Sequence, residues 1–349
     1  MASSSDISAS ERIAWIDAAK GLSIILIVLG HIMSVAEPSA FYIYIYAFHV
    51  PLFFFVSGLT LKPRGDELRS VIIKKSKTIL LPYFIYSLIG YAFYLSGYFV
   101  AQLFGLQIKQ FDYGLLTPLL GIFYGTLGDG RLINTPMWFL IALFCTFMIG
   151  YVINRSVTSR LLSWMIVVAL AVIGYWLSEY KLPWSLSPAL VGLIFFQAGY
   201  THRQIWPESW PKLPAWFLFV FLFILSMFSY INGFAAIANM QLGNPLMYLF
   251  FSFVGLYAVI ALTQAIAKNS GLLSLLGKFS MAILVIHMLV IKSVKVIMAV
   301  LLQTSIAEIE TQVLPSLLVL VLTVALLIPC VKIMERFFPI SLGKPARQA

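Results

Sequence analysis

The sequence predicts an all-α polytopic membrane protein, a bundle of about ten transmembrane helices with both termini in the cytoplasm. Of its 349 residues, 61% are hydrophobic and only 10% are charged, and the mean hydropathy is +0.96. These shares exclude a water-soluble globular protein. Two cysteines, 22 glycines and 16 prolines are ordinary numbers for this length. They exclude collagenous, low-complexity and disulfide-stabilised classes.

Ten segments are long and apolar enough to cross a bilayer, which requires about 20 residues. They are residues 13–34, 41–61, 79–103, 136–153, 161–178, 185–200, 214–231, 246–267, 272–302 and 313–336. No small-residue cleavage site follows the first segment, so we expect an uncleaved helix. Residues 1–12 and 338–349 are then cytoplasmic tails, and residues 13–337 form a single transmembrane domain.

The positions of lysine and arginine predict the sidedness of these helices. With the N-terminus inside, 18 of the 23 basic residues fall on the cytoplasmic side. Only Lys109, Arg131 and Lys181 fall in outer loops, while Lys292 and Lys295 lie within the ninth segment. This bias follows the positive-inside rule. Topology therefore explains most of the net charge of +10, and nucleic acid is not an expected partner.

Two outer segments are candidates to cover a site. Residues 104–135 are polar and glycine-rich, and long loops in compact proteins are often functional. Residues 232–244 are rich in amides and nearly free of charge, which suits ligands with many hydroxyl groups, such as sugars. Solvated connectors would have the same composition, so both interpretations stay open.

Three of the four histidines lie within predicted helices. The helical rise places His31 about 15 Å, and His49 and His287 about 12 Å, from one end of their apolar segments. Ionisable side chains at membrane depth are costly and usually functional, although a histidine can also serve as a hydrogen-bonding contact between helices. His202 falls in an inner loop, where we expect it to be solvated.

One face of the first helix carries charged groups at its cytoplasmic end and an imidazole deeper in the membrane. Lys20 and His31 are eleven residues apart, which places them about 20° apart around the helix and about 16 Å apart along it. Asp17 lies on the same stripe. This face suits an extended, phosphate-bearing molecule that enters from the cytoplasm. Asp17 is the only acidic residue near membrane depth, which argues against a proton-coupled transporter.

Lys292 and Lys295 are three residues apart and share one face of the ninth segment. Snorkelling toward the outer interface and the binding of an anion explain their presence equally well. 

Six stretches of the sequence carry recognisable motifs: Arg12 to Gly21, Val28 to His31, Phe48 to Gly58, Lys74 to Phe84, Met137 to Leu140, and Leu276 to His287. In residues and in order they resemble the motifs of the acyltransferase 3 family of integral-membrane acyltransferases, especially its branch of fucose 4-O-acetylases and exopolysaccharide O-acetyltransferases. They extend over nearly the whole chain.

The resemblance implies an enzyme of a bacterial inner membrane that takes an acyl group, usually acetyl, from cytoplasmic acetyl-CoA. The acceptor is a hydroxyl of a lipid-linked or exopolysaccharide sugar, and no metal is required. The essential histidine of the family falls on His31, and its cytoplasmic basic residue, commonly arginine, falls on Lys20. At a second position where members of the family often have arginine, this sequence has Thr78. The coenzyme A phosphates would then rely on the point charges of Lys20, Lys74, Lys75 and Lys77, with Asp17 positioning Lys20.

Imidazole ionises near neutral pH, which suits His31 as a general base toward the sugar hydroxyl. A transient acetyl-imidazole, with His31 as nucleophile, is the variant. His49 and His287 are candidates to orient the acceptor, hold a second proton or donate to the developing oxyanion. Two other classes stay open, a non-enzymatic transporter or flippase of acyl or lipid-linked sugar species and a structural membrane subunit.

Overall fold

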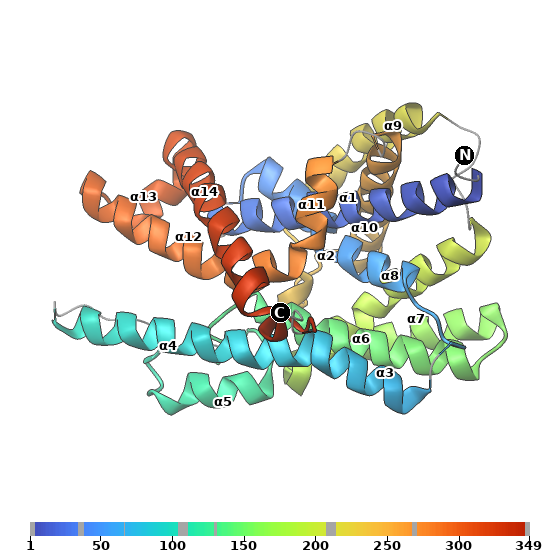
Figure 1. The fold of residues 1–349 in the computed structure, drawn as a ribbon, viewed down its shortest axis with the longest axis horizontal. Coiled ribbons are helices and arrows are strands. Elements are labelled where there is room, and N and C mark those ends of the chain that lie inside the picture. The colour runs from blue at the N-terminus through green and yellow to red at the C-terminus, as the bar shows by residue number, and fades with distance from the viewer. Residues whose placement is uncertain are drawn as a thin grey trace.

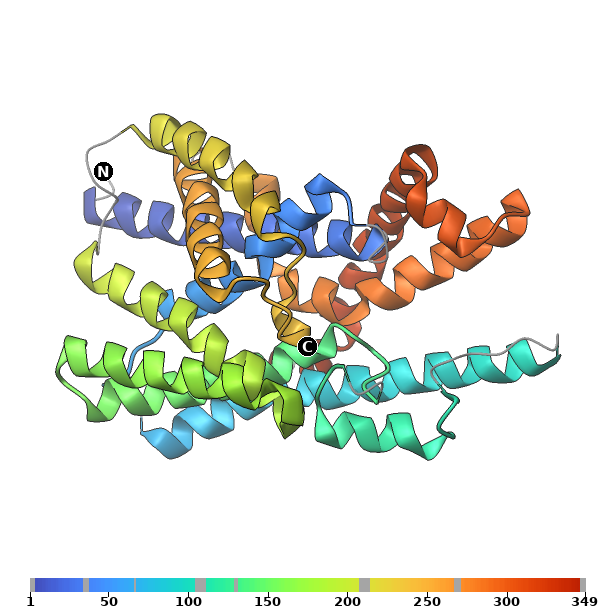
Figure 2. The same cartoon turned by 180° about the vertical axis from the view of Figure 1, so that it is seen from behind.

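The computed structural model describes residues 4–33, 38–65, 67–103, 111–128, 131–206, 214–266 and 271–345, with side chains from Trp15 onward. Within these ranges the regular structure is helical, apart from one isolated bridge between Ala236 and Gln241. The helices form a bundle in which α9 lies beside α10, and α4 lies beside α5 (Figures 1 and 2).

Ten helices make up most of the bundle. They are α1 (Ser4–Ile32), α2 (Ala40–Leu59), α4 (Leu81–Leu103), α6 (Met137–Ser156), α7 (Arg160–Trp176), α8 (Leu186–Ile205), α9 (Ala215–Met227), α10 (Pro245–Ala265), α12 (Ser280–Leu302) and α14 (Val313–Phe337). The shorter helices are α3 (Leu68–Lys75), α5 (Leu116–Tyr124), α11 (Gly271–Lys278) and α13 (Ile306–Thr311). A π-helical turn, Ser76–Leu80, joins α3 to α4.

The predicted all-α polytopic fold is confirmed. In the part of the chain that the structure describes, nine helices are long and apolar enough to cross a membrane. Every predicted segment overlaps one of the ten main helices, and α8 is the main helix that is not apolar enough to count among the nine. The cytoplasmic placement of the two termini stays a prediction.

The prediction of one continuous helix over residues 272–302 is wrong. α11 ends at Lys278 and α12 begins at Ser280, with Phe279 at the turn between them. The physical reason is that α11 packs across α1, which gives it a direction different from that of α12 (Figure 1).

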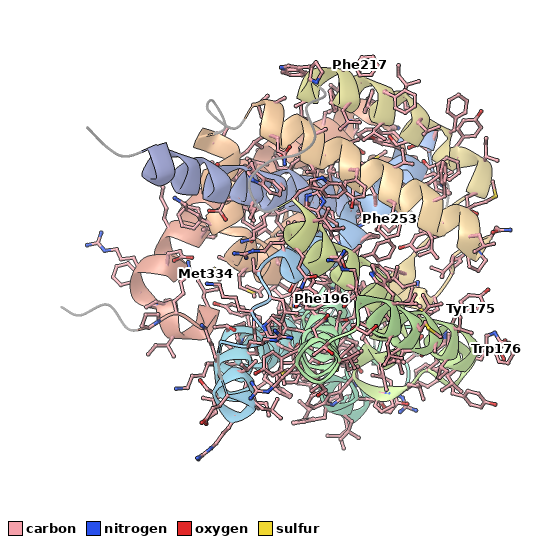
Figure 3. The ribbon with its side chains drawn as sticks, turned by 90° about the vertical axis from the view of Figure 1, so that its right-hand side faces the viewer. Tyr175, Trp176, Phe196, Phe217, Phe253 and Met334 are labelled. Atoms are coloured by element: carbon pink, nitrogen blue, oxygen red, sulfur yellow. The ribbon has the colours of Figure 1, made fainter. Side chains whose placement is uncertain are left out.

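Large apolar side chains on the outside of the bundle match a lipid environment. Trp176 of α7 and Phe217 of α9 are 76% and 63% exposed, and both point away from the bundle (Figure 3). Phe196 of α8 is fully buried. Of the nine candidate spans, that of α6 is the most buried and that of α9 the least, so α6 lies at the centre and α9 at the periphery.

Glycines bring two pairs of helices into backbone contact. A Cβ atom on Gly277 of α11 would lie 1.8 Å from the carbonyl oxygen of Asp17 in α1, and Gly21 makes a comparably close approach in the opposite direction. Gly58 of α2 and Gly199 of α8 form an equivalent contact. Small residues permit such close approach between membrane helices. The first contact fixes α1, the helix that carries the predicted donor and catalytic residues.

Candidate active site

A cavity of about 1120 Å³ lies among α1, α2, α4, α6, α12 and α13. Segments preceding α6 and α10 complete its wall. The ionisable, polar and aromatic residues selected from its lining are His31, Tyr42, Tyr46, His49, Tyr94, Trp138, Asn239, Lys292, Lys295 and Glu310. This volume lies just above the range of about 300–1000 Å³ that is common for small-molecule pockets, so the cavity is large enough for a ligand of one or a few sugar units.

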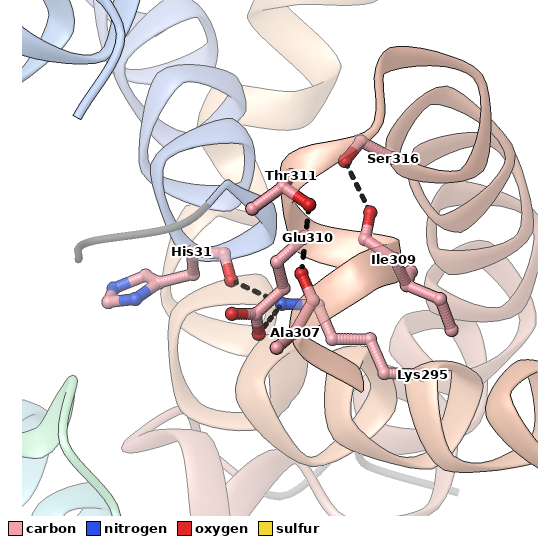
Figure 4. Close-up of polar contacts among 7 residues, drawn as sticks. All are labelled: His31, Lys295, Ala307, Ile309, Glu310, Thr311 and Ser316. Atoms are coloured by element: carbon pink, nitrogen blue, oxygen red, sulfur yellow. Dashed lines mark hydrogen bonds and ion pairs between the residues drawn. The ribbon is translucent and has the colours of Figure 1, made fainter. Parts of the chain in front are cut away.

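His31 lies in the last turn of α1 and lines this cavity. Its backbone carbonyl accepts a hydrogen bond from Nζ of Lys295 at 3.3 Å, while its imidazole points away from that contact (Figure 4). The last carbonyls of a helix lack intrahelical partners and favour a nearby cation. Lys295 therefore holds the end of α1 and leaves the ring of His31 available to the cavity.

His287 of α12 packs against His31. The ring centroids are 5.2 Å apart and the planes are inclined by 45°. Nδ1 of His287 lies 3.1 Å from the carbonyl oxygen of Ile283 and 2.8 Å from that of Leu284. Because carbonyl oxygens only accept, Nδ1 is the protonated nitrogen and Nε2 carries a lone pair.

The Nε2 atom of His287 is buried and lacks a hydrogen-bond partner in the structure. A buried acceptor without a donor is energetically costly, so this atom is available for the N–H of an adjacent group. His31 is the imidazole packed beside it. The pair thus resembles a base with its orienting acceptor.

His49 reaches the same cavity from the middle of α2. Its Nδ1 lies 2.8 Å from the carbonyl oxygen of Ile45, so Nδ1 donates and Nε2 is the free acceptor. The ring stands edge-on to Tyr46 with centroids 4.7 Å apart. His49 therefore presents a hydrogen-bond acceptor with a fixed tautomer.

Pro51, two residues beyond His49, lies inside α2. A proline has no N–H and leaves the carbonyl four residues earlier without its helical partner. That carbonyl belongs to Ala47, and it accepts a hydrogen bond from Oγ of Ser252 in α10 at 2.6 Å. A neighbouring helix thus compensates the proline, as expected at membrane depth.

The two lysines of α12 have different surroundings. Nζ of Lys295 forms an ion pair with Oε1 of Glu310 in α13 at 2.7 Å. Nζ of Lys292 lies 5.3 Å from the ring centroid of Tyr94 in α4. Sequence reasoning missed Glu310, although the need of a buried lysine for a counter-charge was a usable signal.

The mouth of the cavity is apolar. Val100 of α4 and Val296 and Ile297 of α12 line the cavity and are 55%, 50% and 56% exposed. All three lie in the last third of helices that are candidate membrane spans. The cavity therefore opens between α4 and α12 at a position where lipid would contact the protein.

The amide-rich segment that is predicted to lie on the outer side also contributes to the wall. Phe234 and residues 236–239 line the cavity, and the Ala236–Gln241 bridge shapes this loop. Leu127 and Thr135, from the other outer segment, line it as well. Residues 104–110 and 129–130 of that segment lie outside the described residues.

The residues predicted to bind the acetyl-CoA donor lie outside this cavity, which we call the histidine cavity because His31 and His49 line it. Nζ of Lys20 is 3.3 Å from Oδ1 of Asp17, and Lys75 places its ammonium 3.7 Å from the ring centroid of Phe147. Lys74 and Lys77 are exposed. The ammonium of Lys75 lies within electrostatic range of Lys74 and of Lys20. None of these lysines lines the histidine cavity; along α1, about 16 Å separates Lys20 from His31.

A second cavity of about 430 Å³ lies near the turn between α6 and α7. It is lined by Lys62, Arg64 and Arg160, and by the amides of Asn154 and Gln197, which exchange two hydrogen bonds of 2.8 and 3.1 Å. Sequence reasoning assigned these three cations to topology alone. The two amide side chains, Asn154 and Gln197, within otherwise apolar helices were the sequence feature that could have indicated this second cavity.

The prediction for His202 is wrong. This residue lies in α8 and is buried, because α8 continues to Ile205. Its ring packs against Trp206 and Phe55 at centroid distances of 5.0 and 5.5 Å. It does not line the histidine cavity.

Comparison with known proteins gives the family. The acyltransferase 3 family model, described as an acyltransferase domain, matches residues 13–334. Comparisons with curated proteins and with solved structures gave no significant match. The matched range covers nearly all the described helices and every histidine of the cavity, so the chain is an integral-membrane protein that belongs to the acyltransferase 3 family.

Proposed function

We propose that this protein is a membrane O-acetyltransferase that moves an acetyl group from cytoplasmic acetyl-CoA to a hydroxyl of a carbohydrate acceptor. The observation that carries the proposal is the packed pair of His31 and His287 at the wall of a sugar-sized cavity. The membership of the chain in a family of acyltransferases supports the acyl transfer.

His31 is the proposed general base. If its N–H donates to the free Nε2 of His287, its other nitrogen presents a lone pair to the cavity. That nitrogen removes the proton of the acceptor hydroxyl while the oxygen attacks the thioester carbonyl. The new C–O bond forms, the C–S bond breaks, and the proton passes from His31 to the departing thiolate. Attack by His31 itself would give the acetyl-imidazole variant.

His49 and His287 have different proposed roles. The contact of Nδ1 with the carbonyl of Ile45 leaves Nε2 of His49 as the acceptor nitrogen, and His49 lines the cavity, so it suits a hydrogen bond from an acceptor hydroxyl rather than donation to an oxyanion. His287 is fully buried behind His31 and acts as a positioning residue. The two histidines thereby orient the acceptor and the base respectively.

The donor site is proposed at the cytoplasmic end of α1. Lys20, Lys74, Lys75 and Lys77 supply four positive charges against the single carboxylate of Asp17, which holds Lys20 in place. Lysine binds phosphate as a point charge without the fixed fork of arginine. With the phosphates of coenzyme A bound by these lysines, the rest of the coenzyme would extend along α1 and carry the acyl group toward His31, which lies on the same face of the helix.

A lipid-linked or exopolysaccharide sugar in a bacterial inner membrane is the proposed acceptor. The apolar mouth between α4 and α12 supports an acceptor that reaches the cavity from the lipid phase. The same opening favours one alternative, a non-enzymatic transporter or flippase of acyl or lipid-linked sugar species. A transporter would release no free coenzyme A when acceptor is added.

The test uses purified protein in lipid nanodiscs with acetyl-CoA and a panel of sugar acceptors, and it follows free thiol. Acceptor-dependent thiol release supports transfer, and its absence with every acceptor contradicts it. Lys20→Gln should raise the KM for acetyl-CoA about tenfold, as expected for a lost phosphate contact. Lys332→Gln removes an exposed charge of α14 as the matched control. Equal KM values in the two variants would refute the donor role of Lys20.

A further inference from the structure

We propose that Lys292 binds an anionic group of the acceptor, a carboxylate or a phosphate, inside the histidine cavity. The inference rests on the proposed function, because it assigns the acceptor to this cavity. It adds a chemical property of the acceptor, a negative charge close to the hydroxyl that is acetylated.

Lys292 has no salt-bridge partner among the described residues, because Glu310, the carboxylate within its electrostatic range, is paired with Lys295. The carboxylate of Glu310 lies 2.7 Å from Lys295, which also donates to the carbonyl of His31. Among the described residues, no carboxylate lies within 4.0 Å of the ammonium of Lys292; its neighbour is the ring of Tyr94. A cation at membrane depth is costly and normally acquires a partner.

Snorkelling does not account for this lysine. A snorkelling side chain extends along the protein surface toward water, whereas Lys292 lines the cavity and lies against Tyr94 of the facing helix. The face of Tyr94, which is buried, attracts the ammonium and fixes its position between α12 and α4. The charge is therefore directed at the cavity contents.

The position of Lys292 places the anion beside the reacting hydroxyl. Lys292 and His31 both line the histidine cavity, and the ammonium of Lys292 lies within electrostatic range of the imidazole of His31. An acidic group on the acetylated sugar, or on the group linked to it, would thus reach Lys292 while the hydroxyl reaches His31.

The experiment measures binding without catalysis. Purified protein in nanodiscs of zwitterionic lipid is titrated by calorimetry with hexyl β-glucoside, hexyl β-glucuronide and hexyl glucosyl phosphate, which share a gluco-configured pyranose ring and a hexyl chain. We expect at least one acidic ligand to bind about tenfold or more tightly than the neutral one, as a partly buried charge pair would give. The preferred acidic ligand identifies carboxylate or phosphate.

The variants assign that preference to one side chain. Lys292→Gln should abolish the preference and leave the affinity for hexyl β-glucoside unchanged, whereas Lys292→Arg should retain it. Lys181→Gln, which removes an outer charge that does not line the cavity, is the control. No acidic preference in the wild type, or the same preference in Lys292→Gln, would overturn the proposal. Because acetyl-CoA is absent, binding is independent of thiol release, and a protein that binds acids but releases no thiol would contradict the proposed function alone.

Discussion

Alanine at Gly277 is expected to force α11 away from α1. The new Cβ would lie 1.8 Å from the carbonyl oxygen of Asp17, and real contacts of this kind essentially never fall below 3.0 Å. The backbones must therefore separate by about 1.2 Å, because a backbone oxygen cannot rotate away. Overpacking of this kind costs about 1–3 kcal/mol. The displacement also disturbs the 3.3 Å contact between Asp17 and Lys20.

The matched control is Gly271→Ala, at the start of the same helix, where nothing lies within 4 Å of the added Cβ. Thermal unfolding in detergent and the KM for acetyl-CoA are measured for both variants. We expect Gly277→Ala to lower the Tm by about 2–6 °C and to raise the KM, while Gly271→Ala changes neither appreciably. Equal Tm values for the two variants would refute the reasoning about the helix contact.

Two further predictions concern polar contacts between helices. Ser252→Ala removes the donor to the carbonyl of Ala47 and should cost about 1–3 kcal/mol; in a Pro51→Ala background the cost should shrink, because the helix regains its own N–H donor. Equal costs in the two backgrounds, measured by thermal unfolding, would contradict this compensation. Glu310→Gln leaves Lys295 without its counter-charge and should lower the Tm, and Lys295→Met in the same chain should recover part of the loss. An additive loss in the double variant would exclude the ion pair as the cause.

The ten main helices can be located from the sequence because the length of an apolar segment is a local property of the chain. Even α8, which is interrupted by polar groups such as Gln197 and His202, was located by its apolar residues. The break at Phe279 was not predictable in this way, since residues 272–302 are apolar on both sides of it. The break arises from contact between α11 and α1, which depends on Gly21 and Gly277 meeting across 256 positions of the chain.

The candidate site was predictable where few residue types are tolerated at membrane depth. His31 and His49 stand out in sequence, and the structure places both at one cavity. The need of Lys295 for a counter-charge was predictable, but its identity as Glu310 was not, because the pairing requires the short helix α13 to fold back over α12. The proposed donor lysines come from the spacing of Lys20 and His31 and, for Lys74, Lys75 and Lys77, from the family resemblance, and neither determines how far these lysines lie from the cavity.

The most direct test of the account is the transfer of labelled acetyl from acetyl-CoA to a sugar acceptor by the wild type and by His31→Ala in proteoliposomes. Size-exclusion profiles and Tm values establish that the variant is folded. The account predicts a loss of at least about a hundredfold in kcat, as expected for a general base, with the KM for acetyl-CoA nearly unchanged. A folded His31→Ala protein that transfers acetyl at a rate close to that of the wild type would contradict the central claim.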